Sequence, residues 1–318
     1  MRILLVKTTS MGDVIHNLPV VGDIRHAFPG ATIDWVVEAS FAAIPRLHPA
    51  VHAVFPVAVR QWRKQPFSPA TWHAIGAYRR AVSADFYDAV IDTQGLLKSA
   101  LLATPARGPK CGQDAGSARE PVAARFYDRR FSIPRQQNAV VRNRQIVAAA
   151  LGYALDDKPL DYGIAAAPLA GDWLPSRDYA VLLTATSRAD KEWPEDHWCA
   201  LGAALNAAGL ACVLPGGSPA ERERAARLAG RMGNAVAAPS LDLAELAGLM
   251  AGARLVVGVD TGLVHLAAAL RRPTVAIYCG SDPALTGVLG VAGFANLGSI
   301  GAPPAPAEVL AAAQGLLG

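Results

Sequence analysis

Short apolar runs typical of buried strands alternate with amphipathic helical patterns along most of the chain, and this alternation occurs twice. In the first half we expect strands at 2–6, 31–38, 51–58 and 87–95 and helices at 14–28, 40–49 and 69–85. In the second half we expect strands at 178–186, 210–217, 254–260 and 273–280 and helices at 194–209, 218–233, 241–253, 261–272 and 306–318. This order is typical of parallel, doubly wound sheets. The fold class that we predict is therefore α/β, with two Rossmann-like domains.

A stretch rich in Pro, Asp and Gly separates the two halves at 156–178. We interpret it as a linker between an N-terminal domain at 1–155 and a C-terminal domain at 179–318, whose final helix could pack back on the N-terminal domain. In such folds, ligands bind at the carboxyl ends of the strands. Five polar loops fall there, at 8–13, 92–99, 184–191, 214–221 and 259–265.

Charge is divided unevenly between the two halves. Residues 1–150 hold 19 Lys and Arg against 10 Asp and Glu, a net charge of +9, whereas residues 151–318 hold 11 against 16, a net charge of −5. The first half therefore favours an anionic partner, such as a nucleic acid, a phosphorylated glycolipid or an anionic membrane face. The sequence has no apolar run of about 18 residues, and Lys7 interrupts the first apolar run too early for a signal peptide. We expect a cytosolic protein.

The first polar loop places one carboxylate shortly after a buried strand. Asp13 follows Gly12 in the segment TTSMGDVIHNLP and precedes a helical pattern. A carboxylate on a loop at the carboxyl end of a strand suits a general base. The alternative is structural, since Asp13 could cap a helix that begins near Val14.

The segment VVGVDTGLVHLAAAL at 256–270 carries the most specific signal. A strand ends at Asp260, and a helix begins near Thr261 and Gly262, where free backbone N–H groups form an anion site. Asp260 could hold a sugar hydroxyl or cap the helix. His265 could donate to a phosphate or lie in the core.

Two further loops carry polar groups. Thr186 and Ser187 offer hydroxyls, and Lys191 offers a point charge suited to a diphosphate. A solvated loop is the alternative for these three. Glu221 lies in the first turn of a helix that follows two glycines, where it could accept a bond from a ribose diol or favour the helix dipole.

Basic residues gather in the first half. Arg60, Arg63 and Lys64 lie in VRQWRKQPF, which follows a strand and which we expect to be a loop. Lys98 follows DTQGLL, and Arg119 belongs to a later basic group. A phosphorylated acceptor is one physical reason for such a cluster, and a solvated surface is the other interpretation.

At these loops the chain resembles glycosyltransferase family 9, the heptosyltransferases that transfer heptose onto lipopolysaccharide. The motifs that carry the resemblance are KTTSMGDVIHNLP, DTQGLLKSAL, REPVAARFYDRR, TATSRADKEWPEDHW and VDTGLVHLAAAL, and it covers nearly the whole chain. The first and third motifs point to the members that add the first heptose to Kdo, over those that add the second. Ser187 stands where the family often has a second Thr, which keeps the hydroxyl.

The resemblance implies a GT-B fold, with two Rossmann-like domains facing each other across a cleft. It implies inverting transfer of L-glycero-D-manno-heptose from ADP-heptose to the Kdo of Kdo2-lipid A, with Asp13 as the general base. Lys191 would stabilise the charge of the leaving ADP. The resemblance assigns the donor to Thr186, Ser187, Lys191, Glu221, Asp260, Thr261, Gly262 and His265. It assigns the anionic acceptor to Arg60, Arg63, Lys64, Lys98 and Arg119.

We expect no cofactor and no obligatory metal, because the sequence has no DxD motif. The expected partners are ADP-heptose, the lipopolysaccharide inner core and the anionic cytoplasmic face of the inner membrane, to which a monomer would bind peripherally, and no nucleic acid. One alternative is a second-heptose enzyme acting on a heptosylated acceptor. Another is a non-catalytic protein that binds anionic lipid or nucleic acid. A nucleotide-sugar epimerase or dehydrogenase is disfavoured, because GxGxxG and YxxxK motifs are absent from the sequence.

Overall fold

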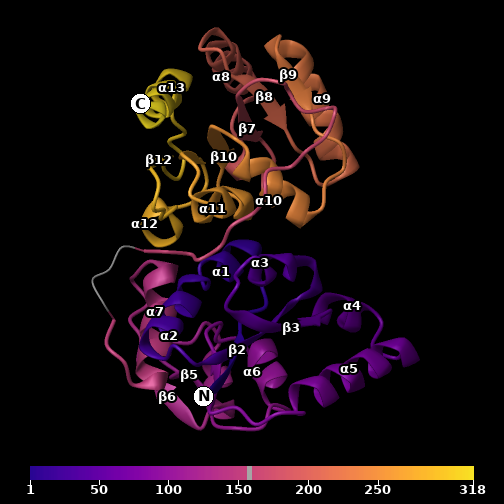
Figure 1. The fold of residues 1–318 in the computed structure, drawn as a ribbon, viewed down its shortest axis with the longest axis vertical. Coiled ribbons are helices and arrows are strands. Elements are labelled where there is room, and N and C mark those ends of the chain that lie inside the picture. The colour runs from indigo at the N-terminus through magenta and orange to yellow at the C-terminus, as the bar shows by residue number, and fades with distance from the viewer. Residues whose placement is uncertain (156–159) are drawn as a thin grey trace. The chain divides into compact units, whose positions relative to one another are not determined.

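The computed structural model of the chain describes residues 1–155 and 160–318. The chain divides into two compact units, Met1–Lys158 and Pro159–Gly318, and each is built on one parallel six-stranded sheet with helices packed on it (Figure 1). The predicted α/β class is therefore confirmed. Residues 156–159 of the predicted linker lie outside the described residues. The rest of that segment, residues 160–178, belongs to the second unit, and in it the Tyr162 hydroxyl donates to the Leu289 carbonyl at 2.8 Å.

The first sheet has the strand order β3-β2-β1-β4-β5-β6. Its strands are β1 (Arg2–Val6), β2 (Thr32–Glu38), β3 (Val51–Val57), β4 (Ala89–Asp92), β5 (Lys110–Gln113) and β6 (Arg129–Phe131). The helices of this unit are α1 (Met11–Ile15), α2 (Pro19–Ala27), α3 (Ala43–Arg46), α4 (Val59–Lys64), α5 (Pro69–Val82), α6 (Leu97–Ala103) and α7 (Ala139–Leu151), with 3-10 turns η1 (Ala39–Phe41) and η2 (Pro121–Phe126).

The second sheet has the strand order β12-β11-β10-β7-β8-β9. Its strands are β7 (Tyr179–Leu183), β8 (Ala211–Leu214), β9 (Ala235–Ala237), β10 (Leu255–Val259), β11 (Thr274–Tyr278) and β12 (Phe294–Gly298). The helices of this unit are α8 (Glu195–Ala207), α9 (Pro219–Met232), α10 (Leu243–Ala251), α11 (Gly262–Ala269), α12 (Pro283–Thr286) and α13 (Pro306–Leu317), with the 3-10 turn η3 (Ala189–Lys191).

Both sheets have the same topology. The first three strands of each unit run outward to one side and the last three to the other, so the first and fourth strands are neighbours. Val6 of β1 pairs with Asp92 of β4, and Leu183 of β7 pairs with Gly258 of β10. The chain reverses its winding direction at these pairs, which makes their carboxyl ends the expected binding points of each sheet.

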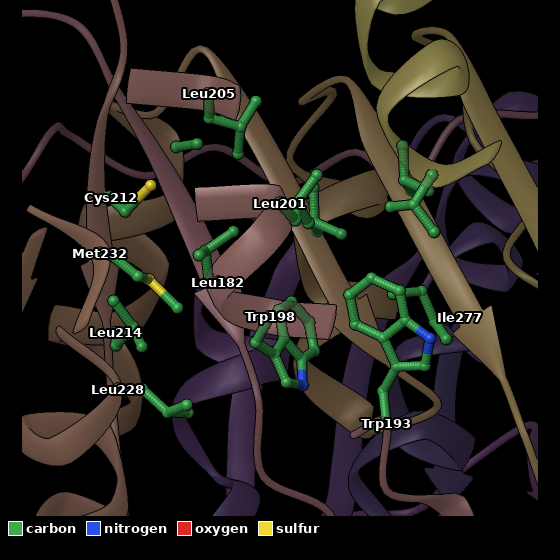
Figure 2. Packing of buried hydrophobic residues seen from close by; sticks show 14 of the residues in the cluster. Leu182, Trp193, Trp198, Leu201, Leu205, Cys212, Leu214, Leu228, Met232 and Ile277 are labelled. Atoms are coloured by element: carbon green, nitrogen blue, oxygen red, sulfur yellow. The ribbon is translucent and has the colours of Figure 1, made fainter. Parts of the chain in front are cut away.

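A large apolar cluster of the second unit fixes one of these carboxyl ends. Leu182 of β7 packs with Trp198 and Leu201 of α8 (Figure 2). Burying each side chain of this size contributes roughly 1.5–3 kcal/mol. Trp193 lies edge-on to Trp198 at 4.9 Å between ring centroids and donates its indole N–H to the Pro304 carbonyl at 3.0 Å. The cluster thus anchors the chain directly after η3.

Three features differ from the sequence predictions. The helix expected at 14–28 is broken into α1 and α2, because Pro19 lacks the N–H that a continuous helix needs and its ring displaces the preceding turn. The segment expected as a loop after β3 is the short helix α4. Strands β5, β6, β9 and β12 were not expected, because each is a short run without a clear alternating pattern, and helices α6, α7 and α12 were not expected either.

The final helix α13 packs on α8 and on strands of the second sheet, with Val309 and Ala313 buried. Its predicted return to the first domain stays a prediction. Within residues 1–155 and 160–318, no helix combines the length and the apolar character needed to cross a membrane.

Candidate active site

At the carboxyl end of β1, the chain is held by the amide of Gln94 from the neighbouring loop after β4. Gln94 Oε1 accepts bonds from the backbone N–H and the hydroxyl of Thr8, both at 2.7 Å, and Gln94 Nε2 donates to the Thr9 carbonyl at 2.9 Å. Asp92 Oδ1 in turn accepts the N–H groups of Gln94 at 2.8 Å and of Gly95 at 3.2 Å. Gly95 has φ +68°, which a glycine adopts without strain. The segment that leads to Asp13 is therefore fixed by buried, paired groups.

Asp13 lies in the first turn of α1, which begins at Met11. The expectation of a loop residue before a helix at Val14 is wrong, because Ser10 serves as the N-cap three residues earlier. The Ser10 N–H donates to Asp13 Oδ2 at 2.9 Å and the Ser10 hydroxyl donates to the same oxygen at 3.1 Å. Asp13 thus supports the helix start. Its side chain nevertheless stays 22% exposed, so it can also meet a ligand.

The charge state of Asp13 follows from its neighbours. Burial alone would raise the pKa of the Asp13 carboxyl, but Lys7, the Ser10 N–H and Arg119 outweigh it and lower this pKa below its usual range. Arg119 Nη1 lies 3.5 Å from Asp13 Oδ2. The carboxyl is consequently ionised at neutral pH, and it can accept a proton but has none to donate.

Lys7 is a buried cation beneath this turn. Its Nζ donates to the Thr93 carbonyl at 3.0 Å and to Asn143 Oδ1 at 3.3 Å. Burial lowers the pKa of Lys7, while the nearby carboxylates Asp13 and Asp92 act in the opposite direction. Burial raises the pKa of Asp92. The positive charge of Lys7 therefore acts on two carboxyl groups, Asp13 and Asp92.

Two further arginines fix the loop that carries Arg119. Arg135 Nε donates to the Ser117 carbonyl at 3.3 Å, and Arg142 Nη2 donates to the same oxygen at 3.2 Å. Burial lowers the pKa of Arg142, and the neighbouring cations Arg119 and Arg135 lower it further. The same loop borders an open hollow of about 460 Å³, lined by residues 116–117 and 132–136. The surroundings of Asp13 are thus strongly cationic and suit an anionic ligand.

Lys98 reaches the same turn from α6. Its Nζ donates to the Thr9 hydroxyl at 2.5 Å. Burial lowers the pKa of Lys98, and among its charged neighbours Arg60 lowers it while Glu38 raises it. The Arg60 N–H lies 3.5 Å from Glu38 Oε1. The first turn of α4 is therefore close to the Asp13 turn.

The other predicted acceptor residues are less closely tied to this turn. Arg63 and Lys64 lie in the last turn of α4, and both are exposed.

In the second unit, Asp260 at the end of β10 is the centre of a polar network. Lys191 Nζ and the Ser281 hydroxyl each donate to Asp260 Oδ2 at 2.5 Å, and the Thr186 hydroxyl donates to the Asp260 carbonyl at 3.3 Å. Asp260 is only 9% exposed. The segment that carries Lys191 lies directly against Gly280, because a Cβ on Gly280 would be 2.7 Å from the Asp190 carbonyl oxygen. The predicted residues Lys191 and Thr186 and the unpredicted Ser281 therefore all bind Asp260.

The start of α11 lies beside this network. Thr261 is its N-cap and Gly262 its first residue, as predicted. The first N–H groups of an α-helix have no partner within the helix and attract anions. His265, one turn later, is buried with its Nε2 3.9 Å from Asp260 Oδ1. The cationic Lys191 and the start of α11 lie beside one carboxylate and suit a diphosphate. The Asp260 carboxylate itself suits the hydroxyls of an attached sugar, which would donate hydrogen bonds to it.

Glu221 and Ser187 are the donor candidates that lie apart from Asp260. Glu221 Oε2 accepts the N–H groups of Gly217 at 2.8 Å and Ser218 at 2.9 Å, and the Ser218 hydroxyl accepts the Glu221 N–H at 3.2 Å. This capping box gives Glu221 a structural role that differs from the helix-dipole interpretation, although Glu221 lies in the first turn of α9 as predicted. Ser187 is exposed on the loop before η3. Their contact with a ligand stays a prediction.

Gln94, Lys7 and Ser281 were missed from the sequence. Gln94 and Ser281 follow parallel strands at the carboxyl edge, and that placement was a usable signal. Lys7 follows an apolar strand directly and could be recognised as a buried cation only from its partners. Among the described residues, no group of three or more His, Cys, Asp or Glu side chains is arranged to hold a metal ion.

A family model described as "Glycosyltransferase family 9 (heptosyltransferase)" matches residues 75–304. The chain is 48% identical over 291 residues to lipopolysaccharide heptosyltransferase 1 of Escherichia coli (strain K12), covering 91% of each chain. It is 47% identical over 294 residues to the protein of the same name from Pseudomonas aeruginosa, covering 91% of this chain and 82% of that one.

A solved structure described as the E. coli heptosyltransferase WaaC with ADP matches with a TM-score of 0.90 and 45% identity, over 97% of this chain and 98% of the other. The same protein solved with ADP-2-deoxy-2-fluoro heptose gives a TM-score of 0.86 at 46% identity, over 95% and 94%. The structure of E. coli ADP-heptose lps heptosyltransferase II, at 20% identity and a TM-score of 0.78, shares the fold. The GT-B class predicted from the motifs is confirmed by these relatives.

Proposed function

Since the chain belongs to glycosyltransferase family 9, the heptosyltransferases, we propose that it transfers heptose from ADP-heptose to the inner core of lipopolysaccharide. The observation that carries this conclusion is 48% identity across 91% of both chains with lipopolysaccharide heptosyltransferase 1 of E. coli. The related structure solved with a fluorinated ADP-heptose supports the donor. The chain is therefore a glycosyltransferase, and the non-catalytic alternative is set aside.

The acceptor that we propose is the Kdo of Kdo2-lipid A, which would receive the first heptose. Relatives at 47% to 49% identity bear the name heptosyltransferase 1, whereas the identity to E. coli heptosyltransferase II is 20%. The cationic surroundings of Asp13 support an acceptor that carries carboxylates and phosphates, because such groups bind Arg and Lys by charge-assisted hydrogen bonds. Arg119, Lys98 and Arg60 lie closest to this turn and are the proposed acceptor contacts, with Arg63 and Lys64 further along α4.

The chemical step needs one base and one leaving group. An acceptor hydroxyl oxygen attacks the anomeric carbon, the bond from that carbon to the diphosphate breaks, and ADP leaves from the opposite face, which inverts the anomeric configuration. The hydroxyl proton passes to the Asp13 carboxylate. Because the pKa of Asp13 is lowered, the carboxyl is ionised and able to accept this proton. No second carboxylate is needed, since no covalent intermediate forms.

The proposed donor residues balance the charge that develops on ADP. Lys191, the first N–H groups of α11 and His265 would face the diphosphate, and Asp260 would hold Lys191 and accept from a sugar hydroxyl. Thr186, Ser187 and Glu221 complete the proposed donor set. The proposed base belongs to the first unit and the proposed donor residues belong to the second.

We expect the enzyme to work as a monomer on the cytoplasmic face of the inner membrane, where its lipid acceptor would be presented. We also expect catalysis without a metal, which activity in the presence of EDTA would test.

The test is ADP release from ADP-heptose by the full chain with Kdo2-lipid A, with a singly heptosylated acceptor, and with no acceptor. Release only with Kdo2-lipid A is the expected result. Release only with the heptosylated acceptor would assign the second transfer instead. Absence of release with both acceptors would overturn the proposed function.

A further inference from the structure

The connection between α4 and α5, residues 59–72, exposes two large aromatic side chains, and we call it the α4–α5 elbow. Phe67 is 93% exposed, more than any other large apolar side chain among the described residues, and Trp72 is 63% exposed. Pro66 and Pro69 flank Phe67, so the turn that presents it is stiff. The two exposed aromatic side chains are five residues apart in the chain, and exposed apolar surface of this kind marks interaction sites where it is contiguous.

The elbow lies in a segment without acidic residues. Residues 39–84 contain no Asp or Glu, and they contain six Lys and Arg. Arg60, Arg63 and Lys64 share one face of α4, being three and four residues apart. Trp62 instead packs inward, with its ring centroid 6.5 Å from that of Tyr78. The inward Trp62 holds the helix to the core and leaves the basic face outward.

The elbow continues from the same sheet edge as the Asp13 turn. It follows β3, whose parallel strand β2 pairs with β1, so the carboxyl ends of all three strands lie along one edge. The Arg60 N–H lies 3.5 Å from Glu38 Oε1, and the Glu38 N–H donates to the Thr8 carbonyl at 3.2 Å, so the first turn of α4 is connected to the segment before Asp13. Figure 1 shows the connection from α4 to α5 at the outer margin of the first unit.

We propose that the α4–α5 elbow docks on the surface of an anionic phospholipid bilayer. Phe67 and Trp72 enter the interfacial layer, while Arg63 and Lys64 meet the lipid headgroups. Stable peripheral binding needs two signals, buried apolar area and attraction to anionic lipid, and this segment supplies both. A bilayer explains exposed aromatic side chains on a Pro-flanked turn better than a nucleic acid does, because proteins that stack bases do so along a basic groove.

This inference rests on the proposed function, because a lipid acceptor gives membrane docking its purpose. Membrane binding itself is tested without the transferase reaction. The experiment is vesicle flotation of the full chain with phosphatidylcholine alone and with added phosphatidylglycerol. The test variant is the double substitution Phe67→Ser and Trp72→Ser. The matched control is Leu285→Ser with Ile300→Ser, which removes two exposed apolar side chains from the second unit.

The wild type should float with phosphatidylglycerol vesicles and much less with phosphatidylcholine, and added salt should release it. The elbow variant should bind at least about tenfold more weakly, because two interfacial anchors are lost, and the control should bind like the wild type. Equal binding by the elbow variant and the wild type, or no vesicle binding at all, would overturn the inference. Elbow-dependent binding to a single-stranded oligonucleotide without vesicle binding would assign a different partner.

Activity on two acceptors separates the elbow from the transferase assignment. The elbow variant should retain the wild-type kcat/KM on a water-soluble, acyl-free Kdo acceptor and lose activity on Kdo2-lipid A in vesicles. If the wild type floats through its elbow yet releases no ADP with either acceptor, the docking surface stands and the proposed function fails. If both proteins use vesicle-bound acceptor equally well, the function stands and the docking surface fails.

Discussion

At the carboxyl edge of the first sheet, Asp13 follows β1 and lies among cations, 22% exposed. At the same edge of the second sheet, Asp260 follows β10, is 9% exposed and is bound by Lys191 and Ser281. The two sheets have one strand order, so topology alone does not decide what the carboxylate does. A carboxylate that keeps an accessible side can take a proton, whereas one enclosed by donors organises the cation beside it.

The carboxylates at the ends of the two fourth strands, β4 and β10, also differ in their surroundings. Asp92 ends β4 as Asp260 follows β10, but Asp92 is buried and its oxygens accept the Gln94 and Gly95 N–H groups and the Tyr127 hydroxyl, the last at 2.7 Å. Asp92 therefore stabilises its own loop. The first unit uses its fourth-strand carboxylate for structure, and the proposed base follows its first strand.

Asp13→Asn is expected to give the largest effect. Asn keeps an oxygen that can accept the Ser10 N–H, but it cannot take a proton, so kcat should fall by about 10²–10⁴-fold. ADP affinity should stay at the wild-type value, because the proposed ADP site belongs to the second unit. Steady-state ADP release and calorimetric ADP binding measure the two effects.

The control is Asp242→Asn, the same change at the N-cap of α10, where the carboxylate accepts the Glu245 N–H at 2.8 Å. It should leave kcat unchanged. If Asp13→Asn also turns over like the wild type, Asp13 is only a helix cap and the base lies elsewhere.

Lys191→Gln should weaken ADP binding at the Asp260 network of the second unit. It removes the cation proposed for the diphosphate and leaves Asp260 without its ion pair to Lys191, and both changes disfavour an anion. The Kd for ADP should rise about ten- to hundredfold, as measured by calorimetry. Arg254→Gln, which breaks an exposed pair with Asp178 at 2.8 Å, is the control and should not change it. Unchanged ADP affinity in Lys191→Gln would mean that the pair with Asp260 only fixes η3.

Much of this architecture is predictable from the sequence because buried parallel strands leave long apolar runs. Strands β1, β7 and β10 and the start of α11 at Gly262 fall where the pattern predicts them. The edge strands β6 and β9 do not, since three residues leave too little pattern. Local signals at the termini of short helices are also ambiguous, which is why the helical turn at Asp13 and the helix α4 were expected as loops.

The candidate site was only partly predictable for a different reason. Residue type and loop position suggest Asp13, Lys191 and Asp260, but the pairing of the last two at 2.5 Å depends on tertiary structure. Gln94 shows the limit most clearly. Nothing in its local sequence indicates that one amide holds a loop 85 residues away in the chain.

Gln94→Leu should have a smaller effect on catalysis than the two changes above. The Thr8 N–H and the Thr9 carbonyl lose buried partners, so stability should fall by about 1–3 kcal/mol for each such group. Since the turn before Asp13 loosens, kcat should fall several-fold. Urea unfolding of the full chain and ADP release measure these effects. Gln314→Leu, at an exposed position of α13, is the control and should change neither, and a wild-type unfolding midpoint in Gln94→Leu would show that the clamp is dispensable.

The smallest predicted effect concerns the pH dependence that distinguishes Asp13 from an ordinary carboxylate. Because its pKa is lowered, Asp13 stays ionised as the pH falls through the usual carboxyl range, so kcat should decline only at lower pH. The stabilisation from its ion pairs is likewise complete above the unfolded-state pKa and is lost as the pH falls through the lowered folded-state pKa.

Arg119→Gln removes one cause of the lowered pKa of Asp13, so the acid limb of kcat should move to higher pH. The shift is small, because Arg119 is 56% exposed and water screens the pair, and it should vanish at high salt. Arg125→Gln, the same change at an exposed residue of η2, should leave the profile in place. An acid limb that is identical in Arg119→Gln and the wild type would mean that Lys7 and the Ser10 N–H hold the charge of Asp13 without Arg119.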